Sequence, residues 1–333
     1  MPSSSLQNHW VPVCTSPQLT ADKPVGIRLY EREIVLWRTT QGIYAGDDTC
    51  AHHGAKLSLG KVCNERLQCP YHGWEYSTNG ECVRIPAEPT LRIPRAARLK
   101  NMHSAVELAG IIWLHLEQST ASLPPMPLHV FASSYSVLSA GGFEVQTSFA
   151  RMCENFMDVA HFPFVHEGTI GLPALPEVAE YKTFELEGCP AASDVVMSVP
   201  NRRDPSTPRV ARFSYRVLSP LCTYYEIGDT PSGDNLFEHA LMLAVRPVSE
   251  ESSAVFFVSA LRELDLDIHA RRLDFELEVF RQDVPVLESV RPKKLPLNLG
   301  AELHLRSDST SVAYRKYLQR LGIGYGTIPS NSR

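Results

Sequence analysis

The chain has 333 residues, enough for one large domain or two ordinary ones, and we expect two. Its composition, 44% hydrophobic and 21% charged, excludes disordered and fibrous proteins, while a net charge of −5 without a basic run argues against nucleic-acid binding. No stretch is apolar enough to span a membrane, and no signal-peptide pattern opens the sequence. Eight cysteines without such a signal favour metal sites and free thiols in a reducing, cytoplasmic setting.

The residue pattern of the N-terminal third predicts an all-β domain. All four tryptophans of the chain lie in this third. Four short β-rich segments lie in it, at residues 25–30, 33–38, 42–45 and 111–116. Residues 117–127 read EQSTASLPPMP, and three prolines beside serine and threonine cannot continue a sheet or a helix. We therefore expect a first domain over residues 1–118, a linker over 119–127 and a second domain over 128–333.

The strand and helix candidates of the second domain predict an α+β fold, in which one antiparallel sheet wraps around a long helix. Its strand candidates are residues 143–149, 179–186, 210–217, 222–227, 239–245 and 254–261. Its helix candidates are residues 151–161, 267–290 and 311–321. Asp308 or Ser309 can cap the last helix, and Gly322 can end it.

A first group of metal-binding residue types lies in residues 50–73, which read CAHHGAKLSLGKVCNERLQCPYHG. Its pattern is a Cys-x-His pair and a Cys-x-x-His pair separated by sixteen residues, formed by Cys50, His52, Cys69 and His72. Two thiolates and two imidazoles in this pattern fit a Rieske [2Fe–2S] cluster. Gly54, Pro70 and Gly73 supply turn chemistry for two loop tips. The alternative is a Cys2His2 zinc site, although zinc sites favour cysteine pairs over mixed pairs.

The segments CAHHGAKLSLG and LQCPYHGWEY resemble the Rieske domain of the non-haem iron ring-hydroxylating oxygenases. The resemblance covers nearly the whole chain, and it implies an N-terminal Rieske domain and a C-terminal helix-grip (START-like) catalytic domain. His53 departs from the family, which usually has arginine there. Ala55 and Tyr71 stand where respiratory Rieske proteins carry a disulfide, so that disulfide cannot form here. We interpret the nearby Cys63 and Cys82 as buried thiols.

A second group lies in residues 151–168, RMCENFMDVAHFPFVHEG, where Asp158, His161 and His166 form D-x2-H-x4-H. Asp158 and His161 are three residues apart, so they would share a helix face. Pro163 would disrupt that helix and let His166 turn back toward the same metal. Two histidines and one carboxylate form the facial triad that binds Fe(II) and leaves positions open for oxygen.

The carboxylate of this triad has more than one candidate. Asp158 is the simple local choice. The resemblance implies instead that this aspartate bridges, and that the third ligand comes from a C-terminal helix. Asp283 is the candidate there, because a lone carboxylate on a buried face needs a metal or an ionic partner. Glu276 is its rival. Four apolar residues surround Asp283 along the predicted helix, Val279, Phe280, Val286 and Leu287, and Pro285 would distort that helix nearby.

The resemblance also implies how the two sites cooperate. In the family, electrons pass singly from the cluster to the mononuclear iron, which activates O2 beside the substrate. Head-to-tail trimers bring the residue matching His72 of one subunit near the one matching His161 of the next, and the residue matching Asp158 links them. Asn155 matches a residue close to the iron.

The electron supply and the substrate are inferred less directly. The glycine run at residues 322–326 lacks the strand–helix context of a nucleotide fingerprint, so electrons from NAD(P)H must come through a separate reductase or ferredoxin. The chain resembles saxitoxin-tailoring hydroxylases and methylxanthine N-demethylases. This implies hydroxylation, or oxidative demethylation, of a polar, nitrogen-rich small molecule. The alternatives are cis-dihydroxylation of an arene and a Rieske electron-transfer protein without oxygenase activity.

Overall fold

The computed structural model describes residues 4–116, 123–201, 207–228 and 238–330. It divides into two compact units, one spanning Gln7–Pro124 and the other Pro125–Arg333 with Met1–Leu6. Much of the expected linker falls on residues 117–122, outside the described residues, so the predicted domain boundaries stay a prediction. No helix in the described ranges is long and apolar enough to cross a membrane.

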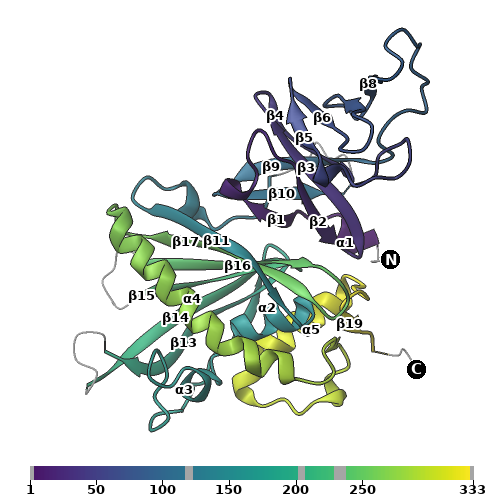
Figure 1. Cartoon of the computed structure of the whole chain (residues 1–333). Helices are drawn as coiled ribbons and strands as arrows, with labels where there is room; N and C mark the ends of the chain where they lie inside the picture. Colours follow the sequence, from purple (N-terminus) through teal and green to yellow (C-terminus); the bar gives the residue numbers. More distant parts are fainter. Residues whose placement is uncertain (1–3, 117–122, 202–206, 229–237, 331–333) are drawn as a thin grey trace. The chain divides into compact units, whose positions relative to one another are not determined.

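The first unit confirms the predicted all-β class, and its strands form two antiparallel sheets (Figure 1). The larger sheet has six strands in the order β1-β10-β9-β4-β3-β2. Its strands are β1 Val11–Thr15, β2 Val25–Leu29, β3 Arg32–Thr39, β4 Gly42–Asp47, β9 Met102–Leu108 and β10 Ile111–His115. The smaller sheet contains β5 Lys61–Cys63, β6 Arg66–Gln68, β7 Glu75–Tyr76 and β8 Cys82–Arg84. Tryptophans 37 and 113 are fully buried in this unit.

The second unit is one seven-stranded antiparallel sheet with helices packed on it, which confirms the predicted α+β class. The strand order is β11-β17-β16-β15-β14-β13-β12. The strands are β11 Ser136–Val145, β12 Thr183–Leu186, β13 Cys189–Pro200, β14 Pro208–Ser219, β15 Cys222–Gly228, β16 His239–Pro247 and β17 Ser253–Leu261. All nine residues of β16 are buried, as expected for a central strand covered on both faces.

The helices of this unit pack against its sheet (Figure 1). The α-helices of the chain are α1 Ser4–Gln7, α2 Phe149–Met157, α3 Phe162–Val165, α4 Leu266–Ser289 and α5 Ser309–Arg320. Short 3-10 turns cover Ser16–Gln18, Leu57–Leu59, Leu128–Phe131, Leu299–Ala301 and Arg306–Asp308, and β18 Leu295–Pro296 pairs with β19 Thr327–Ile328. The long helix α4 packs across the sheet, where Phe280 meets Phe143 of β11 and Phe257 of β17 at ring-centroid distances of 5.9 and 5.2 Å.

Several predicted element boundaries were wrong. The strand expected at residues 143–149 ends at Val145, the strand expected at 179–186 begins at Thr183, and the helix expected at 151–161 covers Phe149–Met157.

The last helix begins at Ser309, two residues before the expected start. Neither candidate side chain caps it: Asp308 accepts from the N–H of Leu305, and Ser309 donates to a backbone carbonyl. Gly322 follows this helix with a φ of +66°, a conformation that glycine adopts without steric cost.

A cluster of four charged side chains joins α2 to α5. Arg315 contacts Glu154 at 2.6 Å and Glu302 at 2.5 Å, and Arg151 contacts Glu302 at 2.5 Å. Burial acts to raise the pKa of Glu302, but the two guanidinium groups outweigh it and lower the pKa. Because α2 precedes the predicted metal ligands directly, this cluster holds the helix that leads into the site.

We expect Arg315→Ala to destabilise the protein by about 3–5 kcal/mol, because it removes one of the two buried guanidinium groups and leaves Glu154 and Glu302 with Arg151 as their remaining counter-charge. The matched control is Arg320→Ala on the same helix, which removes an exposed ion pair with Glu185 and should change stability by less than about 1 kcal/mol. Denaturant unfolding followed by circular dichroism measures both. Equal effects of the two variants would contradict a supporting role for the cluster.

Candidate active site

The two loops that are predicted to hold the cluster have the same pattern of backbone hydrogen bonds and glycine conformations. In the first loop the N–H of Cys50 donates to the carbonyl of Ala55 at 2.9 Å, and in the second the N–H of Cys69 donates to Trp74 at 2.8 Å. Gly54 and Gly73 each occupy the fourth position after the cysteine, with φ values of +74° and +69°. Other residues rarely adopt this conformation, so glycine permits both tight turns.

Among the four predicted cluster ligands, the two cysteines lie next to each other and the two histidines lie next to each other. Burial raises the pKa of the Cys50 thiol, and the neighbouring Cys69 thiol raises it further. The rings of His52 and His72 are 4.6 Å apart. The Nδ1 atom of His52 is buried and has no hydrogen-bond partner among the described residues. An unsatisfied buried nitrogen beside a second imidazole, and two adjacent thiols, fit a [2Fe–2S] group held by two histidines and two cysteines.

Two cysteines near these loops were predicted to be buried thiols, and the structure confirms this for one of them. The thiol of Cys82 is buried and free, as predicted, whereas Cys63 is only half-buried because it ends a short hairpin strand. His53 is exposed, and its ring lies 3.8 Å from that of His52. Tyr76 lies 3.0 Å from the sulfur of Cys50, so its hydroxyl can donate to a thiolate there. No spacing pattern in the sequence points to this tyrosine.

The second predicted site begins where α2 ends. Asp158 ends this helix with an extended backbone, so it and His161 do not share a helix face as predicted. Asp158 instead folds back through its side chain, whose Oδ1 accepts from the N–H of Ala160 at 2.8 Å. Pro163 does not disrupt a helix: it occupies the first turn of α3, where proline is tolerated. His161 and His166 flank this one-turn helix.

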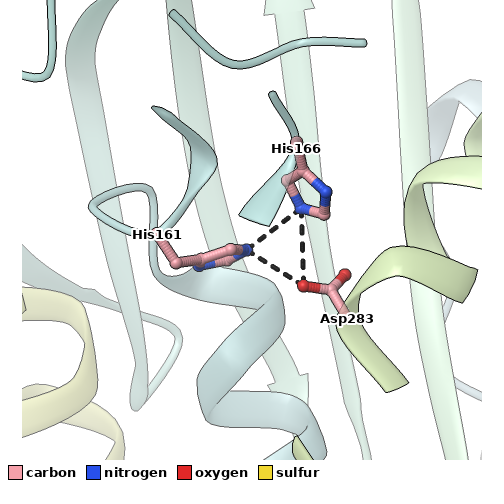
Figure 2. Close-up of side chains that lie close together, drawn as sticks. All are labelled: His161, His166 and Asp283. Carbon is pink, nitrogen blue, oxygen red and sulfur yellow. Dashed lines mark hydrogen bonds and ion pairs between the residues drawn. The ribbon is translucent and has the colours of Figure 1, made fainter. Parts of the chain in front are cut away.

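The side chains of His161, His166 and Asp283 point toward one another (Figure 2). The Nε2 atoms of the two histidines are 3.2 Å apart, and they lie 3.2 and 3.4 Å from Oδ1 of Asp283. Donor atoms at adjacent octahedral positions, about 2.2 Å from a metal, are separated by about 3.1 Å. The three atoms therefore fit one face of an octahedron around a single first-row metal ion.

Asp283 reaches this group from α4, far along the sequence. Its neighbours Val279, Phe280 and Leu287 are buried, as predicted, but Val286 is 49% exposed, because it lies on the outer face of the helix. Pro285 lies inside α4 without ending it. Burial acts to raise the pKa of Asp283, but His161 and His166 outweigh it and lower the pKa, so the carboxylate is charged.

The rival carboxylates lie elsewhere. Glu276 is two turns before Asp283 and forms an ion pair with Arg272 at 2.5 Å. Asp158 faces the other side of the imidazole of His161, with Oδ2 3.0 Å from Nδ1. Burial acts to lower the pKa of His161, but Asp158 and Asp283 outweigh it and raise the pKa to about 9. A metal ion at Nε2 would therefore compete with a proton there.

Two amide side chains complete the surroundings of the triad. Asn155, on α2, donates from Nδ2 to Oδ1 of Asp283 at 3.4 Å, so it lies beside the triad, while its place next to an iron stays a prediction. Gln282 was missed by the sequence analysis: its Oε1 lies 3.0 Å from Nδ1 of His166 and 3.0 Å from the hydroxyl of Thr169. A glutamine before an aspartate carries no signal in the sequence, since its partners come from a distant segment.

A pocket of about 860 Å³, including its opening to solvent, borders the triad. Its walls are mainly apolar and aromatic, which is typical of small-molecule sites. The aromatic residues are Phe156, Phe162, Phe213, Tyr225, Phe257 and Phe280. Since the triad lies at the wall of this pocket, a bound metal would face a small molecule held there.

Two family profiles match the chain. The Rieske [2Fe-2S] domain matches residues 9–97, and the vanillate O-demethylase oxygenase C-terminal domain matches residues 145–322.

Individual proteins match over nearly the full length. Methylxanthine N1-demethylase NdmA of Pseudomonas putida is 31% identical, with 95% of this chain and 89% of the relative covered. Methylxanthine N3-demethylase NdmB of the same organism is 30% identical, with 96% and 90% covered. The solved structure of Pseudomonas putida CBB5 NdmA with caffeine has a TM-score of 0.80 and 29% identity, with 96% of this chain and 92% of that chain covered.

Proposed function

The chain belongs to the Rieske non-haem iron oxygenases, and from this membership we propose that it is a monooxygenase that hydroxylates, or oxidatively demethylates, a polar, nitrogen-rich small molecule. One observation carries the proposal: the triad of His161, His166 and Asp283 borders the apolar pocket. The alternative of a pure electron-transfer protein gives no reason for that triad or for the pocket.

We assign the [2Fe–2S] cluster to Cys50, His52, Cys69 and His72, and the mononuclear Fe(II) to the triad. When bound, these groups supply single-electron transfer and the activation of O2. The chain's own residues set the ligand geometry. The carboxylate of Asp158 accepts from Nδ1–H of His161, and the amide oxygen of Gln282 accepts from Nδ1–H of His166. Both contacts leave the Nε2 lone pairs directed at the metal position.

The pocket supports a small, flat substrate. Its aromatic walls exclude water and can stack against a ring, while Asn155 and Thr169 offer polar contacts beside the triad. The two Pseudomonas putida relatives are methylxanthine demethylases, and methylxanthines are nitrogen-rich. If the oxidised carbon is an N-methyl group, one atom of O2 inserted into a C–H bond gives an N-hydroxymethyl group, and the other atom leaves as water with two electrons from the reductase and two protons. The N-hydroxymethyl group then releases formaldehyde and leaves N–H.

Partners follow from the same proposal. We propose a separate reductase or ferredoxin that delivers electrons from NAD(P)H, in a cytoplasmic setting. We also propose a head-to-tail trimer in which Asp158 links His161 to His72 of the next subunit. The side chain of Asp158 is 27% exposed while it contacts His161, so it can reach a neighbouring chain.

Oxygen labelling tests the reaction type. We expect turnover under 18O2, with a reductase supplying electrons, to place one labelled atom in a hydroxylated product or to release one formaldehyde per substrate consumed. Two labelled atoms in one product would indicate the alternative, cis-dihydroxylation. Electron uptake without any oxidised product, over a panel of nitrogen heterocycles, would support the electron-transfer alternative and contradict the proposal.

A further inference from the structure

The loop that joins β8 to β9, residues 85–101, carries unpaired positive charge (Figure 1). It contains four exposed cations, Arg92, Arg95, Arg98 and Lys100, and one carboxylate, Glu88. These charges give the loop a net charge of +3, whereas the whole chain has a net charge of −5. None of the four cations forms an ion pair or a side-chain hydrogen bond with any residue that the structure describes.

Other cations of the same unit are neutralised by a nearby carboxylate. Five of them form ion pairs, namely Arg32, Arg38, Lys56, Arg66 and Arg84. Like charges repel one another, so unpaired cations gathered within residues 92–100 disfavour the folded loop unless an anion offsets them. The loop is therefore a local positive surface on an acidic protein, and it suits a partner of negative charge.

The inner side of the loop is anchored beside the predicted cluster ligands. Ile85 and Leu99 are buried in the same apolar group of side chains as the two cysteine ligands. Pro86 packs on the second cluster loop, since its Cγ lies 3.2 Å from the point that a Cβ on Gly73 would occupy. Gly73 directly follows the ligand His72. A protein bound to the loop would therefore lie next to the cluster.

The exposed part of the loop has a defined shape, although no helix or strand lies within residues 85–101. The N–H of Leu91 donates to the carbonyl of Glu88 at 3.1 Å, and the N–H of Ala97 donates to that of Pro94 at 2.9 Å. Three prolines restrict the backbone further. Leu91 is 45% exposed among the cations and offers an apolar contact. A surface that is formed in advance loses little conformational entropy when a partner binds.

We propose that the loop of residues 85–101 is the docking surface for an acidic electron-donor protein that reduces the [2Fe–2S] cluster. The inference rests on the proposed function, because it names where the separate reductase or ferredoxin binds and which charge its surface carries. The step moves one electron: the donor protein is oxidised and the cluster is reduced. The loop cations attract the donor over about 10 Å at 0.1 M salt, so they raise the rate of productive encounter.

Binding of an acidic protein to the oxidised holoenzyme tests the proposal. The probe is an oxidised plant-type [2Fe–2S] ferredoxin of net negative charge, and calorimetry measures its affinity. At about 10 mM salt, the variant Arg92→Glu/Arg95→Glu should bind the probe at least about tenfold more weakly than the wild type. At about 1 M salt the difference should largely vanish, because the Debye length there is only about 3 Å.

The matched control changes the net charge equally at a distant place. Arg271 on α4 and Lys316 on α5 are exposed cations of the other unit, and neither has an ion pair among the residues described. Arg271→Glu/Lys316→Glu should bind the probe as the wild type does. Equal weakening in both double variants would show that only total charge matters and would overturn the assignment of the loop.

Anaerobic stopped-flow reduction of the cluster tests whether docking at the loop leads to electron transfer. Reduced ferredoxin is the donor, and its potential of about −400 mV lies below the range of Rieske clusters, so the transfer is downhill. The second-order rate constant should fall at least about tenfold in the loop variant at low salt. Photoreduced deazaflavin, a small neutral reductant, needs no docking and should reduce both proteins equally, which shows that the variant's cluster is intact.

Several results would overturn the proposal. They are absence of salt-sensitive ferredoxin binding by the wild type, and equal affinities or equal reduction rates for the wild type and the loop variant. A loop variant that loses a wild-type oligomer in analytical ultracentrifugation would assign the loop to a second copy of this chain instead. Wild-type protein that binds phosphatidylserine vesicles but no ferredoxin would assign it to a membrane surface.

The two proposals fail separately in these experiments. Neither binding nor cluster reduction uses O2 or a substrate, so a protein that inserts no oxygen can still dock the donor at the loop, which would contradict only the proposed function. An active oxygenase whose donor binding is unchanged in the loop variant would contradict only the role of residues 85–101.

Discussion

Replacing Asp283 with alanine should remove the mononuclear iron and abolish oxygenation while the [2Fe–2S] cluster remains. The reason is geometric: Oδ1 of Asp283 lies 3.2 and 3.4 Å from the Nε2 atoms of the two histidines and is the only negative donor of this group of three. Without it, two neutral imidazoles remain, and they bind Fe(II) weakly. Turnover should fall by more than about 100-fold, beyond the loss typical of residues that only support a ligand. Iron analysis and the cluster's EPR signal measure the result.

The complementary variant is Cys69→Ser, which should lose the red-brown colour and the EPR signal while keeping the mononuclear iron. The two variants together separate the centres, because their ligands come from different parts of the chain. If Asp283→Ala kept the mononuclear iron and Asp158→Ala lost it, the ligand assignment would be reversed, and the bridging role of Asp158 would fall with it.

Replacing Asp158 with asparagine should leave both metal centres occupied and reduce turnover by about 10–100-fold, the range reported for residues that orient metal ligands. The asparagine can keep the contact between Oδ1 and the N–H of Ala160, so the local turn survives. It cannot offer a charged acceptor to both His161 and a histidine of a neighbouring subunit. Single-turnover oxidation of the pre-reduced cluster, monitored by the recovery of the cluster's absorbance after mixing with O2 and substrate, measures the transfer step directly.

A matched control for this variant is Glu167→Gln, which removes an exposed carboxylate next to His166. It should leave turnover unchanged. An Asp158→Asn enzyme with normal turnover, or a fully active monomeric wild type, would show that electrons do not cross between subunits at this aspartate.

The features that could be predicted from the sequence are those that a short stretch of residues specifies by itself. The Cys-x-His and Cys-x-x-His pairs lie within short loops whose glycines are required by the turn, so their spacing alone indicates the cluster. Strands with regular alternation, such as β14, and the 24-residue helix α4 are also evident from pattern. Strand β13 was missed because a bulge between Ala192 and Val195, with Asp194 at a φ of +56°, breaks its alternation.

The environment of the triad could be predicted only in part. The contact between Asp158 and His161 was expected on a shared helix face, but it forms through a side-chain turn after the helix has ended. Asp283 was identified from its apolar neighbours, which is a burial signal, although one of the four faces solvent. Gln282 gave no such signal, because its partners His166 and Thr169 lie on a distant segment that only the fold brings to it. The ligand roles of Asp283 and Asp158 stay predictions until the variants are measured.

The iron and sulfide content of the purified wild-type protein tests directly whether one chain holds both a cluster and a separate catalytic iron. We expect about three irons and two acid-labile sulfides per chain, with one of the irons lost on mild chelation and restored by Fe(II). About two irons and two sulfides, unchanged by added Fe(II), would identify an electron carrier, and zinc in the cysteine loops without sulfide would contradict the assignment of both iron centres.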